Sequence, residues 1–541
     1  MLYNHSMTHA WYHTTTLYQI YPRSFYDSNG DGVGDLPGIL QKLDYLQTLG
    51  VETLWVSPFF SSPQADGGYD ISDYLSIAPE QGAMEDALRL IEETHRREMR
   101  VIFDMVMNHT SAEHAWFKES RASRDNPKAD WYIWRDIPNN WMSMTGGSGW
   151  HYAPERKQYY WASFLPFQPD LNYRNPAVKE AMLNAVRFWL NKGVDGFRLD
   201  IFNVIYKDAQ FRNNPFSFKA MPKENDPSGF FQEYQYSLNQ PESFAFAKEL
   251  RQVCDEFGEK ALLGEVNGSR AIIRRYLGDA SANNGLGLVF DFEMLNFQFN
   301  AGYFRRMIQA LESAYPDPFT PVWVFSNHDR KRSAHRLGND INKAKILMTL
   351  QLTARGVPCL YQGEEIGMTN LPLPFKTALD PITRKYKKYP RFIFDLLGAT
   401  VNRDEVRTPM QWDESLNAGF SSAAQTWLPT HPNYKTLNVQ RQSHESNSLL
   451  RLTQTLLQLR KERRALRDGK LRLIENLPSS ILGYERIAEN ETLTILINFS
   501  SAPQSLERFS HQRLVFKIDA AAVGLSGFDA AIFSPLESPS S

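Results

Sequence analysis

The sequence predicts an α/β fold: a (β/α)₈ barrel, also called a TIM barrel, with a subdomain inserted after the third strand and an antiparallel β domain at the C-terminus. Its 541 residues are enough for one large domain and a smaller one. Short apolar runs alternate with amphipathic helical segments, and several runs are apolar almost throughout, as parallel strands covered by helices are. The predicted strands are 17–21, 53–57, 100–105, 195–199, 261–265, 288–292, 322–326 and 357–361.

The segments between these strands have the spacing of helices that bury one face. In the segment 39–49, leucines recur every three residues, and the segment 177–190 repeats apolar residues with the same period. Alternation of this kind is typical of a parallel barrel with helices on its outside.

Two long stretches interrupt the alternation, and the pattern changes near the end. Residues 110–175 are far longer than a normal connection of about 2–6 residues, so we predict an inserted subdomain over the barrel mouth. The irregular stretch 369–427 is predicted to form a second wall of the site. We assign 1–109 and 176–465 to the barrel, and 466–541 to a C-terminal β-sandwich with strands at 471–474, 481–486, 493–499 and 514–518.

Composition excludes several classes of function. The formal net charge is −2, without a basic stripe, so we expect no nucleic-acid partner. No apolar stretch is long enough to span a bilayer, and the N-terminal residues are polar where a signal peptide is apolar. The two cysteines fit a reducing compartment. We therefore expect a cytoplasmic protein with no membrane partner, as a monomer or weak homo-oligomer.

Polar side chains cluster where the predicted strands end. The third strand ends in Asp104, the fourth in Arg198 and Asp200, the fifth in Glu265, and the seventh is followed by Asp329. In a barrel of this type the chemistry lies at the C-terminal ends of the strands. Arg198 and Asp200 are two residues apart on a strand, so they point to the same side, and the cation is expected to hold the carboxylate ionised.

Asp200 and Glu265 have the placement that a retaining glycosidase needs. Such an enzyme uses an ionised carboxylate as nucleophile and a protonated carboxyl as acid, about 5–5.5 Å apart. Neighbouring strands lie about 4.8 Å apart, which suits that separation. Apolar neighbours are expected to raise the pKa of Glu265. Any one of these groups could be a buried ion pair or a helix cap, but burying all of them for structure alone would be costly.

At this point the chain resembles the α-amylase superfamily of glycoside hydrolases, and within it the oligo-1,6-glucosidase/α-glucosidase group. The resemblance covers nearly the whole chain. It is carried by the segments GVETLWVSP, DMVMNHT, QPDLN, GFRLD, GEV, NHD and RTPMQW.

The resemblance implies roles for the charged residues. Asp200 would be the nucleophile and Glu265 the general acid/base. Asp329 would be a third carboxylate that grips substrate hydroxyls and favours the distorted ring, and Arg198 would orient Asp200. Asp104 is expected to support the site rather than to take part in the chemistry.

It also implies a glucose pocket that is closed at one end. Asp66 and Tyr69 would close it, with Tyr69 stacked on the sugar ring, and Arg407 would form a salt bridge with Asp66. A closed pocket favours removal of one terminal glucose. Tyr69 could instead be an ordinary core residue.

Three further residues are implied to line this pocket. His109 and His328 would donate hydrogen bonds to glucose hydroxyls, and Phe164 would be an aromatic wall. A lone histidine such as His109 could also be structural. Ile201 follows the nucleophile, where relatives carry Val with α-1,6 preference and smaller or polar residues with α-1,4 preference, so the linkage stays open.

The segment DSNGDGVGD is a candidate metal loop. Asp27, Asn29, Asp31 and Asp35 alternate as oxygen ligands, and Val33 can offer its carbonyl, as in the first part of an EF-hand loop. The final glutamate of an EF-hand is missing. The resemblance implies a structural Ca²⁺ or Mg²⁺; the alternative is a metal-free turn rich in Asp and Asn.

The predicted reaction is a double displacement on a small α-glucoside such as maltose, isomaltose or a sucrose-like disaccharide, with no organic cofactor. An alternative from the same superfamily is a glucosyl transferase or isomerase, such as a trehalose synthase-like enzyme, which would share every residue above. A third is a non-enzymatic, transporter-associated relative. Such relatives lose catalytic carboxylates and gain a membrane span, whereas this sequence keeps the carboxylates and lacks the span.

Overall fold

The computed structural model describes residues 10–223, 225–226, 228–396 and 401–536. Within these ranges, eight parallel strands form one sheet in the order β11-β10-β9-β5-β2-β1-β13-β12. A parallel bridge between Phe290 and Val322 connects its two edge strands and closes the barrel. The strands are β1 (Leu17–Ile20), β2 (Thr53–Val56), β5 (Arg100–Val106), β9 (Gly196–Asp200), β10 (Ala261–Gly264), β11 (Leu288–Val289), β12 (Val322–Val324) and β13 (Val357–Tyr361). Each predicted strand is confirmed, although β11 and β12 are shorter than predicted.

Helices surround this sheet and bury their apolar faces against it. In α5, Asn175 caps the first turn by accepting a hydrogen bond from Ala177 N at 2.9 Å, and Pro176 takes the first helical position, where its missing N–H costs nothing. The buried Trp189 on the same helix donates to Tyr74 O at 2.9 Å. The barrel helices are α1 (Leu36–Gln41), α2 (Leu43–Leu49), α3 (Met84–Arg96), α5 (Pro176–Asn191), α6 (Pro241–Asp255), α7 (Arg270–Tyr276), α8 (Ala301–Ala314), α9 (Ser333–Arg336), α10 (Ile341–Thr353) and α14 (Leu449–Glu462).

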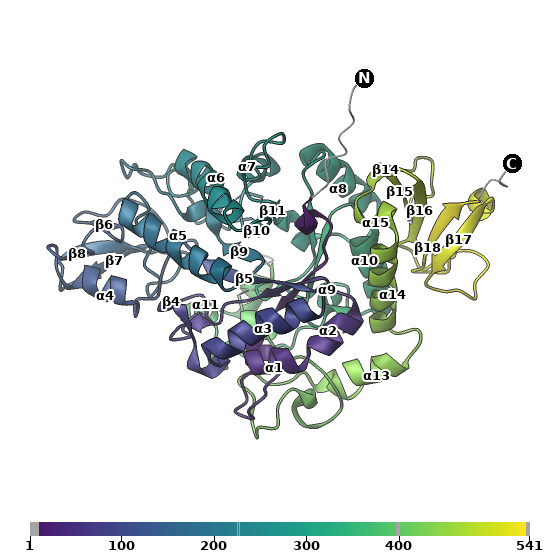
Figure 1. The fold of residues 1–541 in the computed structure, drawn as a ribbon, viewed down its shortest axis with the longest axis horizontal. Helices are drawn as coiled ribbons and strands as arrows, with labels where there is room; N and C mark the ends of the chain where they lie inside the picture. Colours follow the sequence, from purple (N-terminus) through teal and green to yellow (C-terminus); the bar gives the residue numbers. More distant parts are fainter. Residues whose placement is uncertain (1–9, 224, 227, 397–400, 537–541) are drawn as a thin grey trace.

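The inserted subdomain lies at the end of the molecule opposite the C-terminal sheet (Figure 1). Its sheet has the order β6-β8-β7, and an aromatic cluster of Trp141, Trp150 and Trp161 packs beside it. Its elements are α4 (Ala115–Ala122), β6 (Trp134–Arg135), β7 (Trp150–Ala153) and β8 (Gln158–Trp161). The segment that enters the subdomain and the segment that leaves it lie side by side, because His109 and Asp170 form an antiparallel bridge.

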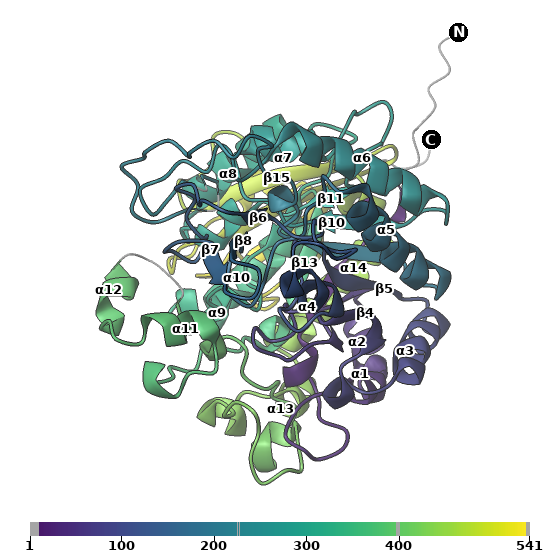
Figure 2. The same ribbon diagram turned by 90° about the vertical axis from the view of Figure 1, so that its left-hand side faces the viewer.

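Shorter elements form the remaining walls. The hairpin of β3 (Phe60–Ser61) and β4 (Asp73–Ile77) follows β2. The irregular stretch after β13 contains α11 (Pro381–Tyr386) and α12 (Arg391–Leu396), and α13 (Val439–His444) follows it (Figure 2).

The C-terminal region differs from the β-sandwich that we predicted. Its described residues form one antiparallel sheet in the order β14-β15-β16-β18-β17. Contacts of this sheet with α8, α10 and α15 (Arg464–Arg467) cover the face that a second sheet would cover in a sandwich. The strands are β14 (Lys470–Leu473), β15 (Ile481–Ala488), β16 (Glu491–Asn498), β17 (Gln512–Lys517) and β18 (Ala530–Pro535), the last of which was not predicted. Across the described ranges, no helix combines the length and apolar character needed to cross a membrane.

Candidate active site

One buried arginine connects three carboxylates at the C-terminal end of the barrel. Arg198 on β9 is 2% exposed. Its Nη1 donates to Asp104 Oδ1 at 2.8 Å and to Asp200 Oδ1 at 2.9 Å, while its Nη2 donates to Glu265. Asp200 ends β9 and Glu265 follows β10, the neighbouring strand, in which Gly264 pairs with Leu199. The structure therefore brings the predicted nucleophile and the predicted acid to the same guanidinium.

Burial opposes the charge on two of these carboxylates, Asp200 and Asp104. It raises the pKa of Asp200 above its usual value, and the positive charge of Arg198 offsets this only in part. Arg198 favours the ionised form of Asp200, as expected from the sequence, and burial opposes it. Burial likewise raises the pKa of Asp104 to about 6; the charge of Arg198 lowers this pKa and the charge of Asp200 raises it further. Asp104 also accepts hydrogen bonds from Trp55 Nε1 at 3.1 Å and from the Tyr69 hydroxyl at 3.0 Å. These contacts with Arg198, Trp55 and Tyr69 fit the supporting role that the sequence predicts for Asp104.

Asp329 is held in its ionised form by two guanidinium groups. Arg407 Nη2 lies 2.5 Å from Asp329 Oδ1, and Arg403 Nη1 lies 3.4 Å from the same oxygen. Burial raises the pKa of this carboxyl, but Arg403 and Arg407 bring it well below its usual range. A third carboxylate therefore stays negative near Asp200, the predicted nucleophile.

His328 is neutral and presents an N–H toward the site. Burial lowers its pKa to about 3. Its Nδ1 accepts from Gln19 Nε2 at 2.7 Å, so the proton of the neutral ring resides on Nε2. That Nε2 is buried and has no hydrogen-bond partner in the part of the chain described, and it lies 3.5 Å from Asp329 Oδ1. The ring stacks on Tyr69 with centroids 5.2 Å apart. The geometry fits a donor to a substrate hydroxyl.

The partner predicted for Asp66 was wrong. Arg403, not Arg407, pairs with Asp66 Oδ1, while Gln168 Nε2 donates to Asp66 Oδ2 at 3.0 Å. Arg407 instead binds Asp329 and donates its Nε to His328 O at 2.9 Å. The two arginines are four residues apart, and a short 3₁₀ turn, Arg403–Glu405, lies before Arg407. Both contact Asp329, but Arg403 is the one that pairs with Asp66. The sequence signal for Arg403 was the second arginine just before RTPMQW.

His109 is fixed by hydrogen bonds on both sides of its ring. Its Nε2 lies 3.1 Å from Tyr69 O, and its Nδ1 lies 3.1 Å from Asn108 Nδ2. Lys207, which sequence reasoning missed, holds Asn108 by donating to its Oδ1 at 2.7 Å. The Phe164 ring lies 5.6 Å from the His109 ring, so the structure places both predicted pocket residues together.

Comparison with known proteins identifies the family. The family model described as "Alpha amylase, catalytic domain" matches residues 19–469. The chain belongs to this family. It is 38% identical over 515 residues to a probable alpha-glucosidase of Rhizobium meliloti, covering 92% of this chain and 91% of the relative. It is also 38% identical over 526 residues to an oligo-1,6-glucosidase of Parageobacillus thermoglucosidasius, with 91% of each chain covered.

Solved structures agree with this assignment. An alpha-glucosyl transfer enzyme, XgtA, superimposes with a TM-score of 0.88 at 37% identity, and the match covers 98% of this chain and 100% of that one. A trehalulose synthase matches with a TM-score of 0.87 at 32% identity, covering 97% of this chain and 100% of that one. The protein is a glycoside hydrolase of the α-amylase family.

The predicted metal loop of this α-amylase-family protein folds as a series of turns closed by its own side chains. Asp27 accepts from the backbone of Gly30 and Gly32, each at 2.8 Å, and Asp35 caps α1 through Gly38 N at 2.6 Å. Within the described ranges, no group of three or more His, Cys, Asp or Glu side chains is arranged to hold a metal ion. The other predicted metal ligands in the loop include the amide oxygen of Asn29 and the carbonyl oxygen of Val33. All the predicted ligands are oxygen atoms, which Ca²⁺ and Mg²⁺ prefer.

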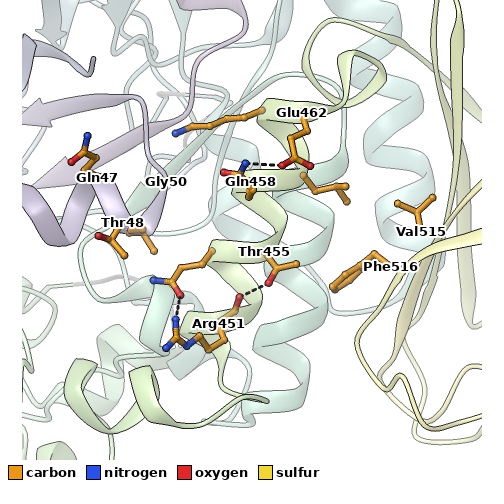
Figure 3. A pocket seen from close by; sticks show the side chains of 13 residues that line it. Gln47, Thr48, Gly50, Arg451, Thr455, Gln458, Glu462, Val515 and Phe516 are labelled. Carbon is orange, nitrogen blue, oxygen red and sulfur yellow. Dashed lines mark hydrogen bonds between the residues drawn. The ribbon is translucent and has the colours of Figure 1, made fainter. Parts of the chain in front are cut away.

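A separate cavity of about 520 Å³ lies between the barrel and the C-terminal sheet (Figure 3). Its lining comes from α2, α14 and β17 and includes Gln47, Arg451, Gln458 and Phe516. None of the strand-end carboxylates lines it, so it is distinct from the candidate active site.

Proposed function

We propose that this chain is a retaining, exo-acting α-glucosidase that releases the terminal glucose of short α-glucosides. The observation that carries the proposal is the position of Asp200 and Glu265 on the same Arg198 guanidinium, at the ends of adjacent barrel strands. Two carboxyl groups so close together suit a double displacement, whereas an inverting enzyme needs room between them for a water molecule.

The residues divide the reaction between them. Asp200 attacks the anomeric carbon while Glu265 protonates the departing oxygen, and Glu265 then deprotonates the water that releases α-glucose. Asp329, kept ionised by Arg403 and Arg407, stabilises the positive charge that develops on the sugar. The free Nε2–H of His328 donates to a glucose hydroxyl.

The exo mode follows from the closed end of the pocket. Asp66 and Arg403 form an ion pair there, and Gln168 holds the other oxygen of Asp66. A glucan chain cannot pass through such a pair, so only a terminal sugar enters. The relatives named alpha-glucosidase and oligo-1,6-glucosidase support this substrate class.

A second candidate is glucosyl transfer, which the match to an alpha-glucosyl transfer enzyme favours. A product time course on α-1,1, α-1,2, α-1,3, α-1,4 and α-1,6 glucose disaccharides and sucrose separates the two. Hydrolysis predicts free glucose, released first as the α-anomer in proton NMR spectra, and Asp200→Asn should abolish it. New glucosides in place of glucose would establish transfer, and β-glucose as the first product would exclude retention.

We further propose that Asp27, Asn29, Asp31, Asp35 and the carbonyl of Val33 bind a structural Ca²⁺ or Mg²⁺. The ion would neutralise the carboxylates of the loop and stiffen it, without a part in the chemistry. We also propose a cytoplasmic protein, consistent with two buried free cysteines.

A further inference from the structure

The short helix α11 carries a buried carboxylate that binds the arginine at the closed end of the pocket. Asp380 is 2% exposed and caps α11 by accepting from Ile382 N at 3.1 Å. Its Oδ1 also accepts from Arg403 Nε at 3.1 Å and from Arg403 Nη2 at 2.9 Å, and its Oδ2 accepts from Arg403 N at 2.9 Å. One carboxylate thus fixes both the backbone and one edge of the guanidinium of Arg403.

That arrangement determines where the other donors of Arg403 point. A guanidinium has five N–H donors in one rigid plane. With Nε and one Nη2 hydrogen directed to Asp380, the remaining donors reach Asp66 through Nη2 and Asp329 through Nη1. Burial lowers the pKa of Arg403, but Asp380, followed by Asp66 and Asp329, raises it above its usual value. Asp380 accepts three hydrogen bonds from Arg403, whereas Asp66 and Asp329 accept one each.

The other end of α11 reaches the inserted subdomain. Lys385 Nζ donates to Thr145 O at 3.1 Å, and the Tyr386 hydroxyl donates to the same carbonyl at 2.5 Å. The Thr145 hydroxyl in turn donates to Phe164 O at 3.1 Å. In about two turns, α11 therefore connects the closed end of the pocket to the segment that carries its aromatic wall.

We propose that Asp380 is a positioning residue, which holds Arg403 across the closed end of the pocket. Through α11 it also fixes that end relative to Phe164, the predicted aromatic wall. The site is thereby shaped to fit one terminal glucose. This inference rests on the proposed α-glucosidase function, because it names a residue that gives that site its shape. Asp380 itself reaches the substrate only through Arg403.

The test compares Asp380→Asn with a matched control, Asp291→Asn. Asp291 is also a buried, helix-capping carboxylate bonded to an arginine, since Arg270 Nε lies 2.6 Å from it, but it contacts none of the pocket residues. Maltose kinetics, glucose affinity by calorimetry and thermal unfolding are measured for both variants. For Asp380→Asn we expect KM for maltose and Kd for glucose to rise together by about tenfold or more, with kcat changed by less than about threefold. The control should keep wild-type KM and Kd.

Three results would overturn the proposal: wild-type KM and Kd in Asp380→Asn, a fall in kcat alone, or the same change in the control. If Asp380→Asn fails to fold, Arg403→Lys replaces it, because one ammonium cannot reach all three carboxylates and should raise KM and Kd in the same way. Unchanged constants there would also refute the proposal. The glucose Kd needs no turnover, so it remains decisive even if the enzyme transfers glucose instead of hydrolysing its substrate.

Discussion

Replacing Arg198 with lysine keeps a positive charge in the site but removes the planar fork that binds three carboxylates. The guanidinium bonds to Asp104 and Asp200 through Nη1 and to Glu265 through Nη2. A lysine ammonium is compact and cannot span these positions, so at least two carboxylates lose a bond. Hydrogen bonds to charged groups contribute about 1.5–3 kcal/mol each, which gives roughly 3–6 kcal/mol for two. At about 1.4 kcal/mol per factor of ten, kcat/KM should fall by about 10²- to 10⁴-fold.

The pH profile should change in a defined direction. Burial raises the pKa of Asp200, and Arg198 is the main group that lowers it. A lysine that loses its hydrogen bond to Asp200 lowers that pKa less than Arg198 does, and Asp200 must be ionised to attack. The acidic limb of the profile of kcat/KM against pH should therefore move to higher pH in Arg198→Lys.

The assay is glucose release from maltose by wild type and variant across the acidic and neutral range. Arg270→Lys serves as the control, because Arg270 pairs with Asp291 at 2.6 Å and Glu293 at 2.8 Å, away from the strand-end carboxylates. We expect it to stay within about threefold of wild type. Retention of most activity by Arg198→Lys, with its acidic limb unmoved, would refute the reasoning.

Three further predictions concern stability and reactivity. Arg486 joins the C-terminal sheet to the end of α10, since it donates to Thr353 O at 2.6 Å and to Gly469 O at 3.0 Å. Arg486→Ala should lower the free energy of unfolding by about 2–4 kcal/mol without changing specific activity. An unchanged midpoint of urea unfolding would contradict this. Chelation should lower the Tm and added Ca²⁺ should restore it, with the initial rate unaffected; identical melting curves would argue against a metal in the loop that begins at Asp27. Cys254 and Cys359 are buried, and burial raises the pKa of Cys254 to about 12. Neither thiol should therefore react with a disulfide reagent until the protein is unfolded. Labelling of the native protein would contradict this by showing that a thiol is accessible.

The sequence predicted the barrel well because parallel strands covered on both faces are apolar along their length, as in VIF at 101–103 or ALL at 261–263. It also predicted that Asp200 and Glu265 meet, since both end neighbouring strands at the same rim. These two predictions depend only on the order of residues along each strand.

Other features depended on contacts between distant segments. The partner of Asp66 could not be chosen from sequence, because Arg403 and Arg407 are only four residues apart and the folded turn decides which of them reaches Asp66. The C-terminal region was predicted as a sandwich because a strand buried against α10 has the same pattern as one buried against a second sheet. Asp380 had no motif around it that marked it for a role.

Trapping the covalent intermediate tests the central claim most directly. A 5-fluoroglucosyl fluoride forms the glucosyl-enzyme quickly, and its ring fluorine slows hydrolysis of that intermediate, so the labelled peptide can be identified by mass spectrometry. The account predicts one 5-fluoroglucosyl adduct on the peptide that contains Asp200. The adduct should persist longer when Glu265 is replaced by Gln, because fluoride leaves without a general acid but the water that hydrolyses the adduct needs a general base. An adduct on a different carboxylate, or no adduct together with release of β-glucose, would contradict it.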